Sequence, residues 1–589
     1  MTSILNSMRR ALADYSLRKF VLYAVVPSHW TQLFALRDRS QLQVLDFSRQ
    51  ISTWLKIEAT SSSQPSLVFR PWLKEAIRRE LPEGQDCGVP PQQGSSDPEI
   101  TLSHDRLGWM LQMAIYDSER CWQAVGAWVA ARWQPCIGHR DAYSISERLS
   151  NLVLMWNFKA PPDPSVEELL RLMERDADHL LAHLEYHGDS KTNNHVLNNA
   201  RALILFGAFI GNAKFYESGC WLFERELPKH VLADGVLREA SAHYQWVVAR
   251  WVVEVGCAFH AKDRARFLVL QPMLEKMLDV CEAMKLGRSG RGYLPLIGDI
   301  SPDFPPALYG GLTGLGYALI GYENEVLSGG QANAGLWARL FVGGSKRGNS
   351  DAWTSSDKSW ARATMGKWSM LAHADRQPHD NRSTHGHHDL FSFELAFDGV
   401  PLVVDPGRRD YLAARDSEEA GILEEWHNTI LVDQCRTGFV PRGYMPTTWL
   451  EKWRSCPELE ADEKGLAIRL VAPGEVPGVS RIERTIRCSD TNQLVIANQI
   501  CKTQRRRIHV LLVLYVMGKV SQADGSLELE LEGQQFTLRW SGLDRPLIRA
   551  ALRYVSYGCA EPCTRLEWRI DIEAAVWESA IMISPVVNR

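Results

Sequence analysis

Histidines and aspartates gather in one short stretch of the sequence. The stretch begins HGHHDLFSFELAFDGVPLVVDPGRRDY and, after a polar loop, continues EEWHNTILVD. His387, Asp405 and His427 are of residue types that bind divalent metals, and three protein ligands leave one position of a tetrahedral zinc ion open. His385 lies two residues before His387, and neighbours at that spacing on an extended segment point to the same face. The sequence therefore predicts a metal-binding cluster beside a histidine that can face a substrate.

The elements expected around this stretch would bring its ligands together. Apolar and polar or small residues alternate through the run LFSFELAF, and Asp398-Gly399 then predicts a two-residue hairpin turn. His387 and Asp405 lie before and after this hairpin, so its two ends return to the same place, and His427 begins the next strand-like run. The residues expected to hydrogen-bond the metal ligands are His388 and Asp389. A set of surface histidines near turns is the alternative interpretation.

A second polar group falls in a helical segment, KTNNHVLNNARALILFGAF. Asn194, Asn198 and Arg201 lie at helical spacing on one face, and His195 begins a neighbouring stripe. Asparagines lower helix propensity, so they usually have another role. Two interpretations stay open here, which are contact with a ligand and capping of the first helical turn by Asn193 or Asn194.

A third group precedes an apolar helix in LADGVLREASAHYQWVVARW. Asp234-Gly235 predicts a turn, and Glu239 and Tyr244 follow it. A tyrosine at a helix entrance is more often a core residue whose hydroxyl reaches water. Tyr244 becomes a candidate catalytic group only if it faces the same cleft as the histidines.

The chain as a whole changes character near its middle. It has 589 residues, more than a single hydrophobic core supports, so two or three domains are expected. Helical periodicity runs from about residue 104 to 340, and period-two alternation with Gly, Asp and Ser turns follows from about residue 350. We therefore predict two segregated domains, a helical one over residues 1–345 and an antiparallel β domain over residues 346–589.

Composition limits the function classes. A net charge of -4 argues against a nucleic-acid binder, and no run of about 20 apolar residues predicts a membrane span. The N-terminal sequence does not have the pattern of a secretory signal, which predicts a soluble protein of bacterial type in the cytoplasm or periplasm. The 21 tryptophans indicate either large helical cores or a carbohydrate groove. The close pair Cys559 and Cys563 is interpreted as buried free thiols or a stray bridge, and not as a zinc site.

The three polar groups together resemble the heparinase II/III family of polysaccharide lyases. The resemblance covers roughly residues 145–260 and 360–435. The family's asparagine-histidine helix matches Asn194-His195, and its DG...E-x-S-x-x-Y segment matches residues 234–244. Its H-x-H-x-D...DPG...HNT signature matches residues 385–389, 405–407 and 427–429, with an additional histidine at position 388 and arginines at positions 408 and 409.

The resemblance implies a fold and a reaction. The fold is an incomplete (α/α) toroid followed by an antiparallel β-sandwich, with the cleft between them. The reaction is β-elimination on a uronic-acid-containing polysaccharide. Asn194 would neutralise the uronate carboxylate, and Tyr244 would act as general base and acid. His385 would be the catalytic histidine, and His195 the base for the epimeric uronate.

The resemblance also implies ligands and partners. A divalent metal, with zinc as the expected ion, would bind His387, Asp405 and His427 and would be mainly structural. The partner would be an acidic polysaccharide or oligosaccharide, and the candidates for binding it are Arg201, Glu239, Arg408 and Arg409. Arg408 and Arg409 could equally be solvated turn residues.

Two other function classes stay open from the sequence. One is a glycan-binding protein, associated with exopolysaccharide biosynthesis, that has no turnover. The other is a metal-assisted glycan hydrolase. Only elimination leaves an unsaturated, ultraviolet-absorbing sugar end, so the product distinguishes the lyase from both.

Overall fold

The computed structural model describes the chain from residue 98 onward, with gaps. The described residues are 98–108, 110, 117–132, 141–158, 160–162, 165–186, 192–287, 293–303, 351–374, 385–411, 421–434, 457–471, 476–489, 492–504 and 506–586. The N-terminal segment and the predicted domain boundary at residues 345 and 346 lie outside them. That boundary therefore stays a prediction.

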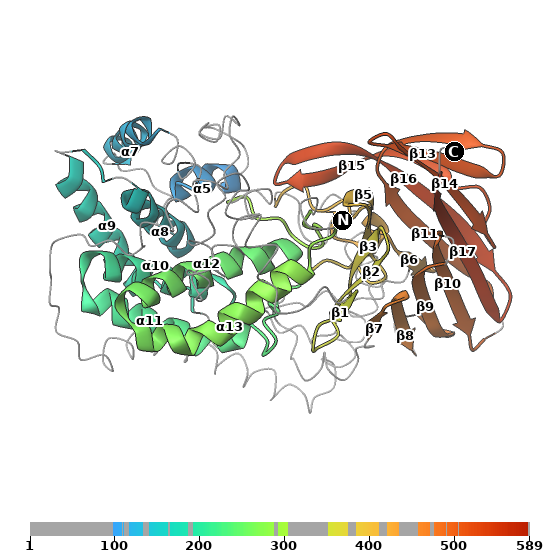
Figure 1. The fold of residues 1–589 in the computed structure, drawn as a ribbon, viewed down its shortest axis with the longest axis horizontal. Coiled ribbons are helices and arrows are strands. Elements are labelled where there is room, and N and C mark those ends of the chain that lie inside the picture. Colours follow the sequence, from blue (N-terminus) through green and yellow to red (C-terminus); the bar gives the residue numbers. More distant parts are fainter. Residues whose placement is uncertain are drawn as a thin grey trace, which may run out of the picture.

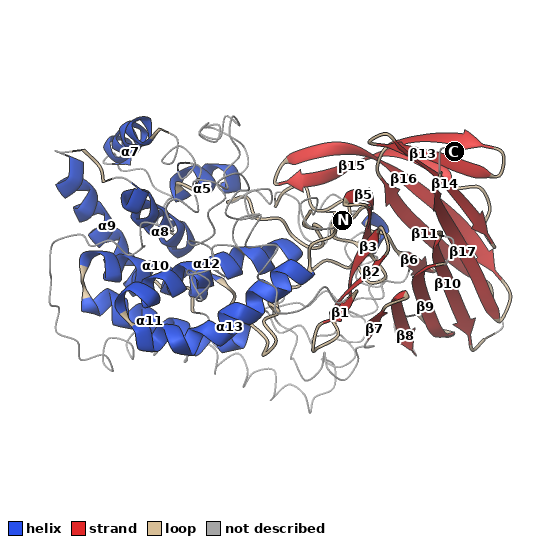
Figure 2. Cartoon of the chain, in the orientation of Figure 1, coloured by secondary structure: helices blue, strands red, loops and turns tan. Residues whose placement is uncertain are grey.

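Helices occupy the first part of the described chain and strands the second (Figures 1 and 2). The helices are α5 (Pro98–Arg106), α7 (Ser118–Arg132), α8 (Ala142–Phe158), α9 (Ser165–Ala182), α10 (His195–Ile210), α11 (Ala213–His230), α12 (Ala242–Lys262) and α13 (Arg264–Ala283). They share one core of buried apolar side chains that runs from Leu107 to Cys281.

Helices α10 and α12 are the centre of this helical part. Every residue of α10 from Val196 to Ile210 is buried, and so is α12 from Ala242 to Phe259. A helix that is apolar nearly all round can be stable only when neighbours surround it. The candidate residues Asn194, His195 and Tyr244 lie at the N-terminal ends of these two helices, which fixes their positions firmly.

Two antiparallel sheets form the second part. The strands are β1 (Ala352–Thr354), β2 (Trp360–Met365), β3 (Trp368–His373), β4 (Phe393–Phe397), β5 (Val400–Val403), β6 (Ile430–Val432), β7 (Pro457–Asp462), β8 (Gly465–Val471), β9 (Val479–Cys488), β10 (Leu494–Lys502), β11 (Ile508–Val516), β12 (Lys519–Ala523), β13 (Ser526–Leu531), β14 (Gln534–Ser541), β15 (Leu547–Ser556), β16 (Cys559–Ile572) and β17 (Val576–Pro585). The first sheet has the order β1-β2-β3-β4-β5-β11-β16-β15, with β6 paired to β11. The second has the order β12-β13-β14-β17-β10-β9-β8-β7.

The first sheet is buried on both faces in its middle. On one face Met370 and Leu395 enter the core shared with the second sheet. On the other, Leu371 and Ala396 pack with Val236 and neighbouring residues of the helical part. The alternation of apolar with small or polar residues along β4 therefore does not mean that one face of the strand is exposed to solvent. Its small and polar residues face the helices.

The predicted hairpin is present between β4 and β5. Asp398 and Gly399 have φ angles of 53° and 83°, the left-handed conformation that a two-residue turn of this kind requires. The turn returns the chain toward its start, so the residues before β4 and after β5 meet.

The predicted fold class is confirmed, since helices and antiparallel sheets are segregated along the chain. The largest fully buried side chains include Trp246, Trp251, Trp360, Trp368 and Trp568, which supports the core interpretation of these tryptophans. Cys559 and Cys563 are free thiols, the first exposed and the second buried. No helix of the described residues is long and apolar enough to cross a membrane.

Candidate active site

Tyr244 and His385 meet where the helical and β parts join. Their rings stack with centroids 3.6 Å apart and planes 10° from parallel. Tyr244 lies in the first turn of α12, where its backbone N–H donates to the Ser241 hydroxyl that caps the helix. The Tyr244 hydroxyl is 3.1 Å from the hydroxyl of Tyr411, which follows the DPG turn. The structure thus brings a phenol and an imidazole from distant segments into one site.

Asp299 connects this site to the predicted metal ligands. One carboxylate oxygen lies 3.2 Å from His385 Nδ1, and the other lies 2.8 Å from His387 Nε2. The backbone N–H of Asp299 donates to the His385 carbonyl, and its own carbonyl accepts from Ser241. Asp299 is 1% exposed. This aspartate therefore fixes both histidine rings from a segment of the helical part.

His195 lies on a second side of the same site. Its Nδ1 is 3.0 Å from the Glu185 carboxylate, and its ring packs on Tyr143 at 4.5 Å. Burial alone would lower the pKa of His195, but the hydrogen bond and charge of Glu185, with the nearby Glu239 carboxylate, raise it above the ordinary value. Glu239 also lies 3.8 Å from His385 Nε2. It therefore sits between the two histidines.

Asn194 has a buried side chain without a hydrogen-bond partner. It is 0% exposed, and neither its amide nitrogen nor its amide oxygen is paired among the described residues. It occupies the N-cap position of α10 but makes no capping bond, while the Asn193 side chain accepts from the backbone N–H of His195. Capping therefore explains Asn193 and leaves the Asn194 amide available.

His387, Asp405 and His427 form the cluster that their spacing predicts. Each offers one potential ligand atom, and these atoms all lie within 4.8 Å of one another in a buried position. Within the described ranges, His387 Nδ1 and His427 Nε2 have no hydrogen-bond partner, whereas buried polar atoms normally have one. The residues therefore fit a metal ion. His387 would present Nδ1 to it, because Asp299 occupies Nε2, a carboxylate–histidine arrangement common around metals.

The pKa values of Asp405, His427 and His387 reflect both their burial and their contacts with one another. Burial alone would raise the pKa of Asp405, but His427, 2.9 Å away, outweighs it and holds the pKa below its usual range. The same contact raises the pKa of His427, against burial, which would lower it. Burial lowers the pKa of His387, which keeps that imidazole neutral, as a metal ligand must be.

Arg201 does not reach the site. It is 0% exposed, and it pairs with Glu147 at 2.7 Å and with Glu254 at 2.5 Å inside the helical core. The structure therefore contradicts its predicted substrate-binding role. The helical spacing with Asn194 is correct, but the side chain lies too deep among helices.

Arg408 is also engaged inside the protein. Its guanidinium donates to both oxygens of Asp299, at 3.1 and 3.2 Å, and lies over the Tyr411 ring at 4.4 Å. This corrects its predicted role as a direct substrate ligand, since its charge balances Asp299. Arg409 has an exposed side chain, 2.5 Å from Asp410. Its geometry fits a solvated turn residue and leaves its role as a substrate ligand a prediction.

Sequence reasoning missed several residues of the site. Asp299, Tyr411, Tyr143 and Glu185 carry no motif, and each comes from a loop or helix whose approach depends on the packing of both parts. The sequence predicts that Asp389 hydrogen-bonds one of the metal ligands. In the structure its carboxylate instead lies 3.0 Å from Nδ1 of His373. Its only sequence signal was its proximity to His387.

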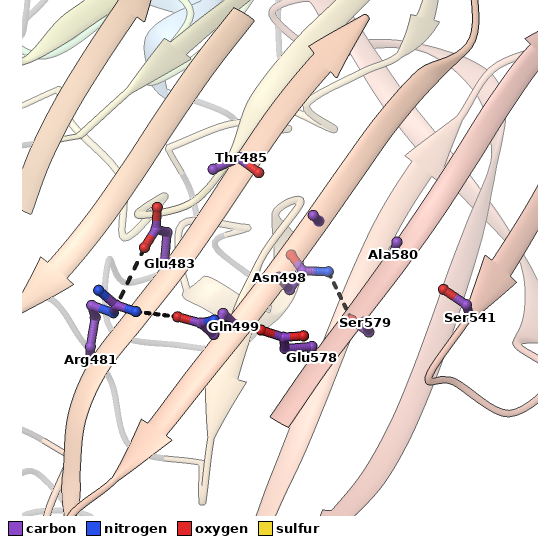
Figure 3. Close-up of a pocket in the computed structure, with 10 residues that line it drawn as sticks. Arg481, Glu483, Thr485, Asn498, Gln499, Ser541, Glu578, Ser579 and Ala580 are labelled. Atoms are coloured by element: carbon purple, nitrogen blue, oxygen red, sulfur yellow. Dashed lines mark hydrogen bonds and ion pairs between the residues drawn. The ribbon is translucent and has the colours of Figure 1, made fainter. Parts of the chain in front are cut away.

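A separate hollow of about 530 Å³ lies on the second sheet, between strands β9, β10, β14 and β17 (Figure 3). Arg481 bonds Gln499, and Gln499 donates to Glu578 at 2.7 Å across the strands. Arg481 also lies 3.8 Å from Glu483, so the charged groups of this hollow have partners within it. None of the candidate catalytic or metal-binding residues lines this hollow.

Comparison with known proteins agrees with this fold. Residues 347–532 match the family model described as heparinase II/III-like, C-terminal. The chain is similar to a solved heparinase III, with 14% identity and a TM-score of 0.62, covering 92% of this chain and 89% of that one. A heparinase III gene product with methylated lysines gives 14% identity and a TM-score of 0.56, covering 96% and 92%. A heparan sulfate lyase mutant from Pedobacter heparinus gives 14% identity and 0.55, covering 94% and 89%.

No curated protein matches the sequence. The solved structures share too little identity with this chain to show more than a common fold. Residues 347–532 are nevertheless matched as a heparinase II/III-like C-terminal domain, and the chain shares the two-domain fold of the solved heparinase structures. This confirms the resemblance predicted from the motifs.

Proposed function

We propose that this protein is a polysaccharide lyase that cleaves a uronic-acid-containing chain by β-elimination. The observation that carries the proposal is the stacked pair of Tyr244 and His385, formed by the two parts of the molecule at one site. A glycan-binding protein has no need of a phenol and an imidazole held in contact by a buried carboxylate. An acid–base enzyme does.

The first step removes the proton on C5, which is weakly acidic because it is α to the carboxylate. Negative charge then builds on that carboxylate. The Asn194 amide is buried at the N-terminus of α10 and has no partner among the residues that the structure describes, so it can donate to the carboxylate without first breaking a hydrogen bond to any of them. Preorganisation of this kind typically contributes about 3 kcal/mol for one donor.

The second step protonates the leaving glycosidic oxygen. Burial raises the pKa of Tyr244, so its phenol keeps a proton at neutral pH that it can donate. When the C5 proton lies on the same side of the ring, the reaction begins from the phenolate form of Tyr244, which takes the C5 proton and then passes this same proton to the leaving oxygen. When it lies on the opposite side, His195 is the base. His385 is held by Asp299 and stacks on the Tyr244 ring, so it positions the phenol. It also stabilises the negative charge that develops on the phenol oxygen when Tyr244 gives up its proton.

A metal at His387, Asp405 and His427 would have a mainly structural role. It would supply fixed positive charge and hold together the segments that carry the three ligands. Through Asp299, the orientation of His387 also fixes His385. Zinc suits two imidazoles and one carboxylate.

The test is the product formed from a panel of acidic polysaccharides. Elimination leaves an unsaturated uronate that absorbs in the ultraviolet, and a hydrolase does not form this product. Tyr244→Phe should lower kcat at least ~1,000-fold, at the upper end of general acid–base contributions. It should keep metal content and thermal stability, because Tyr411 is the one described residue to which the lost hydroxyl is hydrogen-bonded. Full activity in this variant would refute the assignment. Cleavage without ultraviolet absorbance would favour the hydrolase.

A further inference from the structure

Arg484 is a buried arginine without a carboxylate partner among the described residues. It belongs to β9 in the second sheet and is 0% exposed. Its guanidinium donates to the Asn498 side chain at 2.9 Å and to the backbone carbonyls of Phe391 at 2.9 Å and Asn428 at 2.8 Å. Among the described residues, its positive charge therefore faces neutral oxygens and the Phe393 ring, whose centroid lies 5.6 Å away.

The residues on either side of Arg484 on the same face of β9 are apolar, so an apolar residue would be expected at this position. Ile482 and Ile486 lie on the same face of β9, and both are fully buried in the core between the sheets. Burying a guanidinium there has a substantial desolvation cost, and burial lowers the pKa of Arg484 to about 9. Buried charged networks are often less stable than an apolar replacement of similar volume. The arginine therefore has a role other than filling the core.

The backbone carbonyls that Arg484 binds, those of Phe391 and Asn428 and, at 3.5 Å, that of Thr429, belong to the segments that form the candidate site. Phe391 follows His385 and His387 by a few residues, in a left-handed backbone conformation with φ of 71°. Asn428 directly follows His427. A planar guanidinium offers several donors in a fixed geometry, so it holds two carbonyls at a set separation.

Asn428 extends this link to the third segment. Its side-chain amide donates to the carbonyls of Phe393 at 2.8 Å and of Val404 at 2.9 Å, the residue before Asp405. Its amide oxygen accepts from the backbone N–H of Tyr515 on β11. Arg484 and Asn428 thus connect all three segments that carry His387, Asp405 and His427.

We propose that Arg484 is a positioning residue of the active site, which sets the spacing of the His385–His387 and His427 segments from the far side of the sandwich. The second sheet then contributes to the reaction without touching the substrate. This inference rests on the proposed function for its kinetic consequence. Its structural consequence, the geometry of the metal cluster, can be tested separately.

The experiment compares Arg484→Met and Arg484→Lys with Arg148→Met. Arg148 is equally buried, but it pairs with Asp176 in the helical core, so its loss destabilises the protein without touching the site. Zinc affinity is measured by chelator competition at a temperature where every variant is folded. We expect Arg484→Met to weaken zinc binding about 10- to 100-fold and to lower kcat more than it changes KM. Arg484→Lys keeps the positive charge but loses the planar guanidinium, so its zinc affinity should lie between those of Arg484→Met and the wild type. Arg148→Met should retain the wild-type zinc affinity.

A second measurement covers the case in which Arg484→Met does not fold or the wild type binds no zinc. Hydrogen exchange of the amides in residues 385–393 and 427–432 is then compared between wild type and Arg484→Lys. Exchange should be faster in both segments, while helix α11, which makes no contact with Arg484 among the described residues, is unchanged. Wild-type zinc affinity in Arg484→Met, or unchanged exchange in Arg484→Lys, would overturn the proposal. A wild type that binds zinc but cleaves no polysaccharide would refute the proposed function and leave the zinc comparison valid as a test of Arg484.

Discussion

At the residue scale, Asn194 shows how function and stability can oppose each other. Its amide is fully buried and unpaired among the described residues, and an unsatisfied buried polar group costs about 1–3 kcal/mol. Asn194→Leu removes that cost with little change in volume. We expect the variant to be as stable as the wild type or more stable, by up to about 2 kcal/mol, and to lose at least ~100-fold in kcat.

Denaturant unfolding and steady-state kinetics on the same preparation check this expectation. A clear loss of stability in Asn194→Leu would mean that the amide has a structural partner. Retained activity would remove Asn194 from the proposed mechanism.

Glu394 gives a pH dependence that does not involve the reaction. This carboxyl is buried beside Arg553, and burial raises its pKa from 4.5 to about 7. Below pH 4.5 it is protonated in both the folded and the unfolded state. Between pH 4.5 and 7 the folded state keeps a proton that the unfolded state loses, so its contribution to stability falls as pH rises, by about 3 kcal/mol in total.

The measurement is the free energy of unfolding of wild type and Glu394→Gln at several pH values. The wild type should lose stability relative to the variant between pH 4.5 and about 7, and the difference should then level off. A difference that does not depend on pH would show that Glu394 stays ionised when folded.

At the scale of elements, the DPG turn links the hairpin to the metal cluster. Gly407 has φ of 68°, its N–H donates to Asp405 at 3.0 Å, and a Cβ there would lie 3.3 Å from the Tyr554 carbonyl on β15. Gly558 has a similar φ of 70° but open space around it. It therefore provides a matched control for backbone strain alone.

We expect Gly558→Ala to cost about 1 kcal/mol of stability, because its only change is strain in the left-handed conformation. Gly407→Ala should cost more, and it alone should weaken zinc binding by displacing Asp405. Thermal unfolding and chelator titration of both variants measure the two effects. Equal zinc affinity in the two variants would show that the turn does not control the cluster.

At the scale of the whole molecule, the site depends on how the helical part sits on the first sheet. Trp360 is 1% exposed and packs in the apolar cluster at this junction, with Val236, Ile297 and Leu371. Trp568 is equally buried, but it lies between the two sheets. Either tryptophan replaced by alanine should cost about 3–5 kcal/mol.

Their effects on activity should differ. Trp360→Ala should lower kcat/KM about tenfold or more in the folded protein, because a shift of about 1 Å between Tyr244 and His385 can impair the reaction strongly. Trp568→Ala should keep most of its activity when assayed well below its melting temperature. Similar losses in both variants would show that general destabilisation, and not the junction, limits the reaction.

Local patterns in the sequence were enough to predict the hairpin and the helix that carry most of the candidate residues. The alternation and the Asp398-Gly399 turn predicted the β4–β5 hairpin, and the hairpin placed His387 near Asp405. Helical spacing located α10, with Asn194 and His195 at its start. These features were predictable because the turn and the helix depend mainly on residues close together in the chain.

Which of these residues share one site depends on contacts between segments far apart in the chain. Asp299 reaches His385 and His387 from a segment about 90 residues earlier, and no local pattern marks such an approach. Arg201 lies inside the helical core, away from the site, where it pairs with Glu147 and Glu254. Arg408 pairs with Asp299. Burial and pairing of charged groups depend on contacts between distant segments, so spacing along the chain can nominate such residues but cannot assign their partners.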